Sequence, residues 1–103
     1  MTIVSLTAIQ PKAGADWTAI QKQISAGNEI AKRHGAENVT VMATMAGGPA
    51  TGGVTILTTA SDWTAYGRTQ DAMWADPEMQ ALTANPDSPI ATWHTYVSQT
   101  LDI

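Results

Sequence analysis

The chain has 103 residues, 44% of them hydrophobic, and nine acidic against five basic side chains give it a net charge of −4 at pH 7. This charge, with no basic cluster larger than Lys32–Arg33, argues against a nucleic-acid partner, whose affinity rests on phosphate neutralisation, and against an anionic membrane surface. The absence of Cys excludes disulfides and thiolate catalysis. The length predicts one domain, residues 1–103, with a modest core.

No apolar run reaches the roughly 20 residues that a membrane span needs. The start, MTIVSLTAIQ, has no basic segment ahead of its apolar part, so we expect no signal peptide. We therefore expect a cytoplasmic protein with no membrane partner.

The first quarter of the chain predicts a strand followed by a helix. Residues 2–9 are rich in β-branched side chains and alternate between apolar and polar, which is typical of a strand. Asp16 is expected to cap a helix whose apolar or small positions recur every three or four residues from Trp17 to His34. Gly35 then suits the left-handed residue that ends many helices.

Two further strands are predicted in the middle of the chain, at 38–46 and 54–60. The segment between them, GGPATGG at 47–53, contains too much glycine for regular structure and is interpreted as a mobile loop or hairpin tip.

The second half predicts a broken helix and a long last strand. A helix begins at SDWTAY, and the step Asp76–Pro77 interrupts it, because Pro lacks the N–H and clashes with the preceding turn. Asp76 is expected to cap a short second segment, 77–84, with Pro77 at its first position. A turn-rich loop (85–89) precedes the predicted strand 90–101.

A five-residue repeat marks the two halves: ADWTA at 15–19 returns as SDWTA at 61–65. We interpret both copies as a helix cap and helix start, although five letters rich in Ala and Thr also coincide by chance. The order β-α-β-β-α-β predicts an α+β, ferredoxin-like fold: a four-stranded antiparallel sheet with both helices on one face.

This arrangement leaves the other face of the sheet bare, and a small monomer does not leave a broad apolar face in water. On the first strand, Val4, Leu6 and Ala8 form a purely apolar set that is predicted to face the helices. The opposite set mixes aliphatic and hydroxyl side chains, and we predict that it lines a semi-polar cavity closed by a second copy of the chain. On the third predicted strand, residues 54–60, the two faces do not separate into an apolar set and a mixed set.

On the last strand the same alternation predicts Trp93 and Val97 toward the helices and His94 and Tyr96 toward the cavity. Because His94 and Tyr96 share a face, both are able to contact one small ligand, with His94 as a proton acceptor. The alternative is a hydrogen-bonded structural His. A metal site is not expected, because the carboxylates it would need at ligand spacing are absent around His94.

The element order, the helix broken at MWADPEMQAL and the long last strand resemble the dimeric α/β-barrel superfamily, which includes antibiotic-biosynthesis-type monooxygenases, NIPSNAP-like and EthD-like proteins. The resemblance implies a homodimer whose two sheets pack face to face. Quinone-forming monooxygenases of this group use a Trp with an Asn one turn before it. Trp74 matches the Trp, and Gln70 stands at the amide position.

Haem-degrading members need an axial His shortly after that Trp, and the corresponding ALTANP contains none, so we expect no cofactor. For Trp74 the alternative to a ligand-facing role is packing between helix and sheet. Trp17 and Trp63, which follow the two capping Asp residues, are expected to be core anchors.

The leading hypothesis is a dimeric barrel that binds a small organic molecule, as a cofactor-independent monooxygenase or an acid–base isomerase or cyclase acting on an aromatic or polyketide-like substrate. The alternative is a non-enzymatic dimerisation or ligand-sequestering module with a filled barrel. The candidate catalytic residues are His94, Trp74 and Gln70. The candidate substrate-binding residues are Tyr96, Thr7, Ser5, Met42, Thr44 and Tyr66.

Overall fold

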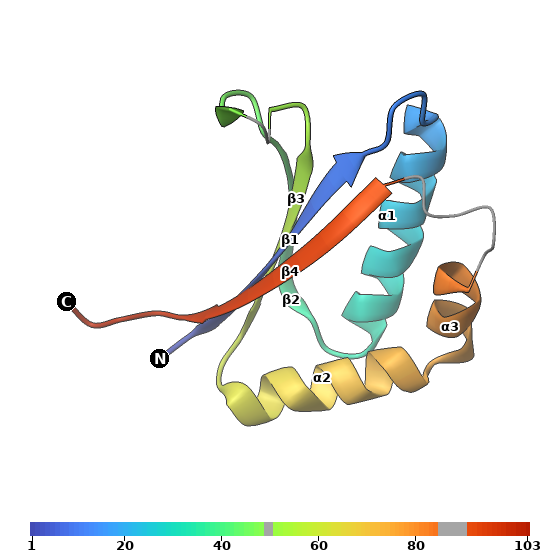
Figure 1. Cartoon of the computed structure of the whole chain (residues 1–103). Coiled ribbons are helices and arrows are strands. Elements are labelled where there is room, and N and C mark those ends of the chain that lie inside the picture. Colours follow the sequence, from blue (N-terminus) through green and yellow to red (C-terminus); the bar gives the residue numbers. More distant parts are fainter. Residues whose placement is uncertain (49–50, 85–90) are drawn as a thin grey trace.

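The computed structural model describes residues 1–48, 51–84 and 91–103, and within them the chain forms the predicted β-α-β-β-α-β order (Figure 1). The second helix is continued by a short third one. The elements are β1 (Ile3–Pro11), α1 (Trp17–Arg33), β2 (Glu37–Ala43), β3 (Val54–Ala60), α2 (Trp63–Ala75), α3 (Pro77–Thr83) and β4 (Ala91–Gln99). The predicted loop at 85–89 and part of the predicted glycine-rich loop lie outside the described residues.

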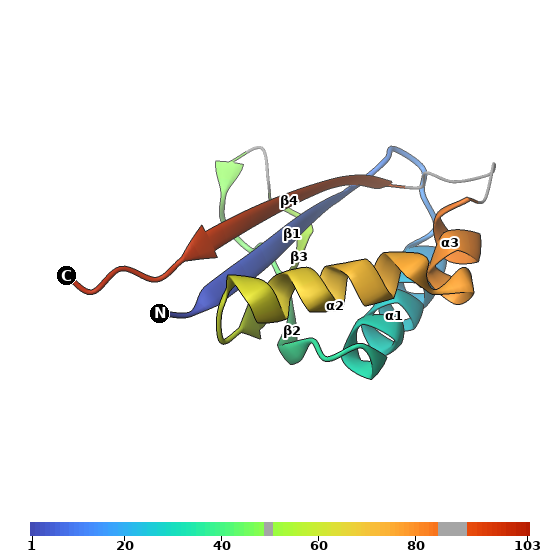
Figure 2. The same cartoon turned by 90° about the horizontal axis from the view of Figure 1, so that it is seen from below.

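The four strands form one antiparallel sheet in the order β2-β3-β1-β4. All three helices lie on one face of it, and Figure 2 shows them as a second layer beneath the strands. The predicted α+β, ferredoxin-like architecture is therefore confirmed. None of the helices in the described ranges combines the length and the hydropathy of a membrane span.

The repeated pentapeptide marks two equivalent helix starts, as predicted. The Asp16 carboxylate accepts a hydrogen bond from the Thr18 backbone N–H (3.0 Å), and the Asp62 carboxylate accepts one from the Ala65 N–H (2.7 Å). These bonds satisfy N–H groups that the first turn of a helix leaves without a partner.

The two Trp residues of the repeat are not core anchors, and that prediction is wrong. Trp17 is 46% exposed and Trp63 is 48% exposed, since the first position of each helix lies at the end of the layer rather than over the sheet. Trp63 instead ties α2 to the last strand, because its indole Nε1 donates a hydrogen bond to Oε1 of Gln99 (3.0 Å).

The packed core lies beneath α1. It joins that helix to the sheet through Ile9, Ile20, Ile24, Val54, Ile56 and Ala91. By contrast, none of the 13 residues of α2 is buried. The layer is therefore well filled under α1 and incompletely filled under α2.

The strand register corrects one predicted face. Ser5 pairs with Val97 and Thr7 with Thr95, and this set points toward the helices. The prediction that Val4, Leu6 and Ala8 face the helices is therefore wrong, and these three lie on the bare face. On this strand the more apolar set of side chains is not the set that faces the helices, because hydroxyl groups are acceptable on the floor of a cavity.

The last strand keeps its predicted orientation. Trp93 and Val97 lie on the helix side, and His94 pairs with Ala8 on the bare face. The bare face is consequently the more uniformly apolar one near its centre. Its apolar and aromatic members are Val4, Leu6, Ala8, Met42, Leu57 and Tyr96.

Candidate functional site

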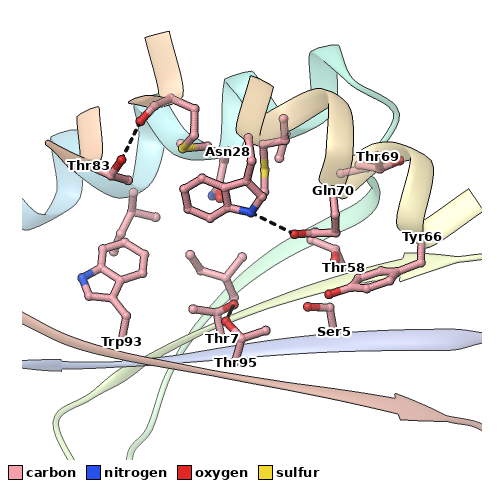
Figure 3. Close-up of a pocket in the computed structure, with 18 of the residues that line it drawn as sticks. Ser5, Thr7, Asn28, Thr58, Tyr66, Thr69, Gln70, Thr83, Trp93 and Thr95 are labelled. Carbon is pink, nitrogen blue, oxygen red and sulfur yellow. Dashed lines mark hydrogen bonds between the residues drawn. The ribbon is translucent and has the colours of Figure 1, made fainter. Parts of the chain in front are cut away.

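A cavity of about 410 Å³ occupies the space between the sheet and the helices. Its floor comes from β1, β3 and β4, and its roof from α1, α2 and α3. This volume lies within the range of small-molecule sites, roughly 300–1,000 Å³. Figure 3 shows side chains from both layers pointing into the same space.

The floor of the cavity carries hydroxyl groups. Thr7 and Thr95 stand opposite each other on neighbouring strands, and their Oγ1 atoms are 3.0 Å apart in a hydrogen bond. Ser5 and Thr58 are a second cross-strand pair, two residues further along the same face. The register thus places two pairs of small polar side chains where larger apolar ones would fill the space (Figure 3).

Gln70 and Trp74 of α2 form the centre of the roof. They lie one helical turn apart, and the indole Nε1 of Trp74 donates a hydrogen bond to Oε1 of Gln70 (3.2 Å; dashed in Figure 3). An indole N–H only donates, so this bond identifies the oxygen of the Gln70 amide. The Nε2 of Gln70 then remains as a donor for another group.

Tyr66 extends the roof from the preceding turn of α2. Its ring and the ring of Trp63 form an edge-to-face pair, with centroids 6.1 Å apart and planes at 89°, a favourable geometry for aromatic rings. In Figure 3 the Tyr66 side chain reaches down toward Ser5 and Thr58 on the strands. Hydroxyl groups therefore gather at this end of the cavity.

Trp93 and Thr83 line the opposite end. Trp93 rises from β4 (Figure 3) and is 39% exposed, so one side of its indole borders the cavity and another meets solvent. The Thr83 hydroxyl donates to the backbone oxygen of Met79 (3.0 Å). This end combines an aromatic wall with the apolar side chains of Met79 and Leu82.

The lining within the described residues contains no Asp, Glu, Lys, Arg or His. Likewise, no group of three His, Asp or Glu side chains able to hold a metal ion occurs in the described ranges. The chemistry that this site offers is therefore hydrogen bonding from amide, hydroxyl and indole groups between apolar and aromatic walls.

The structure brings five of the candidate residues to this cavity: Ser5, Thr7, Tyr66, Gln70 and Trp74. It does not bring the other four to it. His94, Tyr96 and Met42 lie on the opposite face of the sheet by strand register. Thr44 continues the β2–β3 hairpin, where its backbone N–H donates to the Gly53 oxygen (2.9 Å).

The predicted grouping of Ser5 and Thr7 with His94 on one face is thus corrected, since pairing with Val97 and Thr95 puts them on the other. The cavity that the structure contains lies inside one chain, between helices and sheet. The predicted one lay on the bare face, on the expectation that side chains fill the space under the helices.

Sequence reasoning missed several lining residues, among them Gln23, Asn28, Thr58, Thr95 and Thr83. One signal could have identified Gln23. It interrupts the apolar stripe of α1 between Ile20 and Ile24, both buried, and a polar side chain within such a stripe points to a polar space beneath the helix.

No protein-family model and no curated protein matches the chain. Solved structures do match. A NIPSNAP family protein of unknown function from Agrobacterium tumefaciens is 17% identical, with 94% of this chain and 86% of that chain aligned and a TM-score of 0.73. An uncharacterised NIPSNAP-like domain protein from Burkholderia xenovorans is 16% identical over 97% of this chain and 85% of that chain, with a TM-score of 0.75.

The chain is also similar to SnoaB from Streptomyces nogalater, described as a cofactor-independent oxygenase. The identity is 9% over 99% of this chain and 95% of that chain, with a TM-score of 0.72. At these identities the likeness concerns the fold. The resemblance to NIPSNAP-like and monooxygenase-like ferredoxin folds, inferred from element order and the broken helix, is confirmed at that level.

Proposed function

We propose that the protein binds a small organic molecule in the cavity beneath α2 and oxygenates it without a cofactor, as a homodimer. The observation that carries the proposal is the cavity itself, about 410 Å³ in volume, with Gln70 and Trp74 hydrogen-bonded in its roof. The fold shared with SnoaB suggests the reaction class. Because one fold hosts many activities, the proposal depends on the cavity and is tested by turnover.

The lining favours a planar, mostly apolar substrate. Trp74 and Trp93 supply aromatic surface, and Met73, Met79 and Leu82 supply apolar surface. Aromatic rings bind one another through offset or edge contacts. A flat aromatic ketone with one or two polar groups matches such walls.

In this proposal Gln70 stabilises negative charge on the substrate. When a methylene conjugated through the rings to a ketone loses a proton to water, the charge moves to the ketone oxygen. Trp74 binds the Oε1 of Gln70, and the Nε2 of the same amide donates to the ketone oxygen. Positioned donors of this kind commonly contribute a factor of about 100–1,000 in rate.

Dioxygen then oxidises the ionised substrate. The methylene carbon keeps one oxygen atom as a new carbonyl, and its two hydrogens leave with the second oxygen atom as water. The acid–base isomerase reading is less well supported, because it also needs a protein group that returns the proton at a second position of the substrate. The described lining residues include no imidazole or carboxylate, and His94 lies on the opposite face of the sheet.

Anthrone is a suitable test substrate, since with dioxygen it gives anthraquinone and water. We expect the wild-type protein to consume dioxygen and form anthraquinone faster than the spontaneous reaction. Gln70→Leu should lower the rate about 100-fold. Trp74→Phe should lower it less, because it releases the Gln70 amide without removing it.

Gln21→Leu is the matched control, because Gln21 is exposed on α1 and does not line the cavity. It should leave the rate unchanged. Anthrone binding with no oxygen consumption above the spontaneous rate would favour the ligand-sequestering alternative. The absence of both binding and turnover would contradict the proposed site.

A further inference from the structure

We infer that Gln23 determines ligand specificity in this cavity. Its Oε1 accepts a hydrogen bond from a hydroxyl or N–H group of the ligand, and the ligand is uncharged when it binds. This inference rests on the part of the proposed function that concerns binding beneath α2, and it is independent of the oxygenation step.

The position of Gln23 points its amide into the layer between helix and sheet. It lies on α1 between the buried Ile20 and Ile24 and one turn before Gly27. Gln23, Ile24 and Gly27 all line the cavity. The side chain therefore belongs to the inward face of the helix, where solvent does not reach its oxygen.

The Gln23 Oε1 is buried and has no hydrogen-bond partner among the described residues. A buried carbonyl oxygen without a partner lowers stability, and native structures rarely retain one without a ligand, ion or water that completes it. An amide oxygen only accepts. The group that completes this oxygen is therefore a donor.

Three other polar contacts in the cavity wall are complete within the protein. Thr7 bonds to Thr95, Trp74 to Gln70, and Thr83 to the backbone of Met79. Gln23 differs from them because its buried oxygen is left open. The wall thus offers a donor in the roof, at Gln70, and an acceptor on α1, at Gln23.

The charge of the ligand follows from the lining. The described lining residues carry no ionisable group that is charged at neutral pH. An ion that enters such a space loses its hydration without gaining a counter-charge, which is strongly unfavourable. The site therefore favours an uncharged, largely apolar molecule that presents a hydroxyl or N–H group toward α1.

Three naphthalenes test this inference by calorimetry at pH 7. 2-Naphthol offers a donor, 2-methoxynaphthalene offers only an acceptor, and 2-naphthoate carries a negative charge. We expect the wild-type protein to bind 2-naphthol about fivefold more tightly than the methoxy compound, because this ratio corresponds to the net contribution of one hydrogen bond. 2-Naphthoate should bind at least about tenfold more weakly than 2-naphthol.

Gln23→Leu should abolish the preference for 2-naphthol over 2-methoxynaphthalene, and Gln21→Leu should retain it. Gln23→Leu should also raise the melting temperature of the ligand-free protein, because it removes a buried oxygen without a partner. A purely structural Gln23 would instead lower it. Gln23→Met, which keeps the length of the side chain, should repeat both results.

Equal binding of 2-naphthol and 2-methoxynaphthalene to the wild type overturns the role of Gln23 and leaves the proposed cavity standing. Tight binding of 2-naphthoate overturns the uncharged ligand class. Failure of all three compounds to bind the wild type contradicts the proposed function as well. The wild-type comparison needs no variant, so the inference is testable even if a substitution prevents folding.

Discussion

Trp93 illustrates how a single side chain borders both solvent and the cavity. It lies on the helix side of β4, as its place in the strand predicts, yet 39% of it remains exposed. A Trp buried in a core would cost about 3–5 kcal/mol on truncation to Ala. Because Trp93 is partly exposed, we expect its truncation to affect ligand binding more than the stability of the fold.

We therefore expect Trp93→Ala to lower the free energy of unfolding by only about 1–2 kcal/mol while weakening 2-naphthol binding. Ile20→Ala, which truncates a fully buried side chain, should cost about 2–5 kcal/mol. Urea unfolding of both variants gives the comparison. Equal losses for the two substitutions would show that Trp93 belongs to the core.

His94 tests the assignment of the cavity from the other face of the sheet, where a substitution should not affect binding. Since it lies on the bare face and pairs with Ala8, we expect His94→Ala to leave 2-naphthol binding within about twofold of the wild type, as for a distant site. Calorimetry checks this. A large loss of affinity would place the ligand on the other face of the sheet, where sequence reasoning had placed it.

At the scale of elements, the junction between α2 and α3 is held by charge. Asp76 accepts the N–H of Glu78 at the start of α3, and its Oδ2 lies 2.7 Å from Nε2 of His34 at the end of α1. Arg33 bonds to both Asp76 and Glu78, at 3.2 Å each. This cluster keeps α1 beside the break in the second helix, which positions Trp74 over the cavity.

These contacts lower the pKa of Asp76 below its ordinary value, first through the hydrogen bond with His34, then through the backbone N–H of Glu78 and the charge of Arg33. A carboxyl whose folded-state pKa is depressed stabilises the fold above its unfolded pKa, near 3.9. That stabilisation is lost as the pH falls through the lower, folded value.

We expect Asp76→Asn to be less stable than the wild type at pH 6 and the difference to shrink as the pH is lowered below about 4. Asn keeps a capping oxygen, so the substitution removes mainly the charge. Thermal unfolding at several pH values measures the difference in stability between the variant and the wild type. Asp62→Asn is the control, because the described contacts of that cap are to backbone only, and a parallel pH dependence there would contradict the role of the cluster.

At the scale of the whole molecule, the bare face of the sheet presents apolar side chains. Leu6 and Leu57 pair at its centre, Val4 and Ala8 lie beside them, and Tyr96 is 61% exposed. An apolar face of this kind is typical of an interaction surface, and we propose that a second copy of the chain covers it, as the resemblance to dimeric barrels implies.

The chain should therefore behave in light scattering as a dimer, with twice the 10.9 kDa of one chain. Leu6→Asp, which places a charge at the centre of the bare face, should shift the mass toward the monomer, whereas Lys22→Glu on the exposed side of α1 should not. A wild-type monomer at micromolar concentration would exclude the barrel.

Much of the fold was predictable because it depends on local chemistry. The repeated Asp residues cap helices wherever the chain goes, since the bond is to a backbone N–H two or three residues away. The break at Asp76–Pro77 follows from the missing proline N–H. The strand positions follow from β-branched alternation, and their order then leaves few possible topologies.

The candidate site was predictable only in part. Gln70 and Trp74 were identified through the resemblance to quinone-forming monooxygenases, and their one-turn spacing also produces their hydrogen bond. Ser5 and Thr7 were identified as cavity residues and assigned to the wrong cavity. His94 was assigned to the site because a His beside a Tyr on one strand face is a chemically capable pair, but capability does not decide which side of the sheet binds a ligand.

By itself, the sequence determined the order of the elements, the starts of the helices and the approximate extent of each strand, because capping, proline and side-chain direction act within a few residues. Only the tertiary structure decided which face of β1 meets the helices, that no residue of α2 is buried, and that the Gln23 oxygen has no partner among the described residues. These properties depend on how completely distant segments fill the space between them, and packing of that kind is a property of the assembled layers rather than of any local pattern.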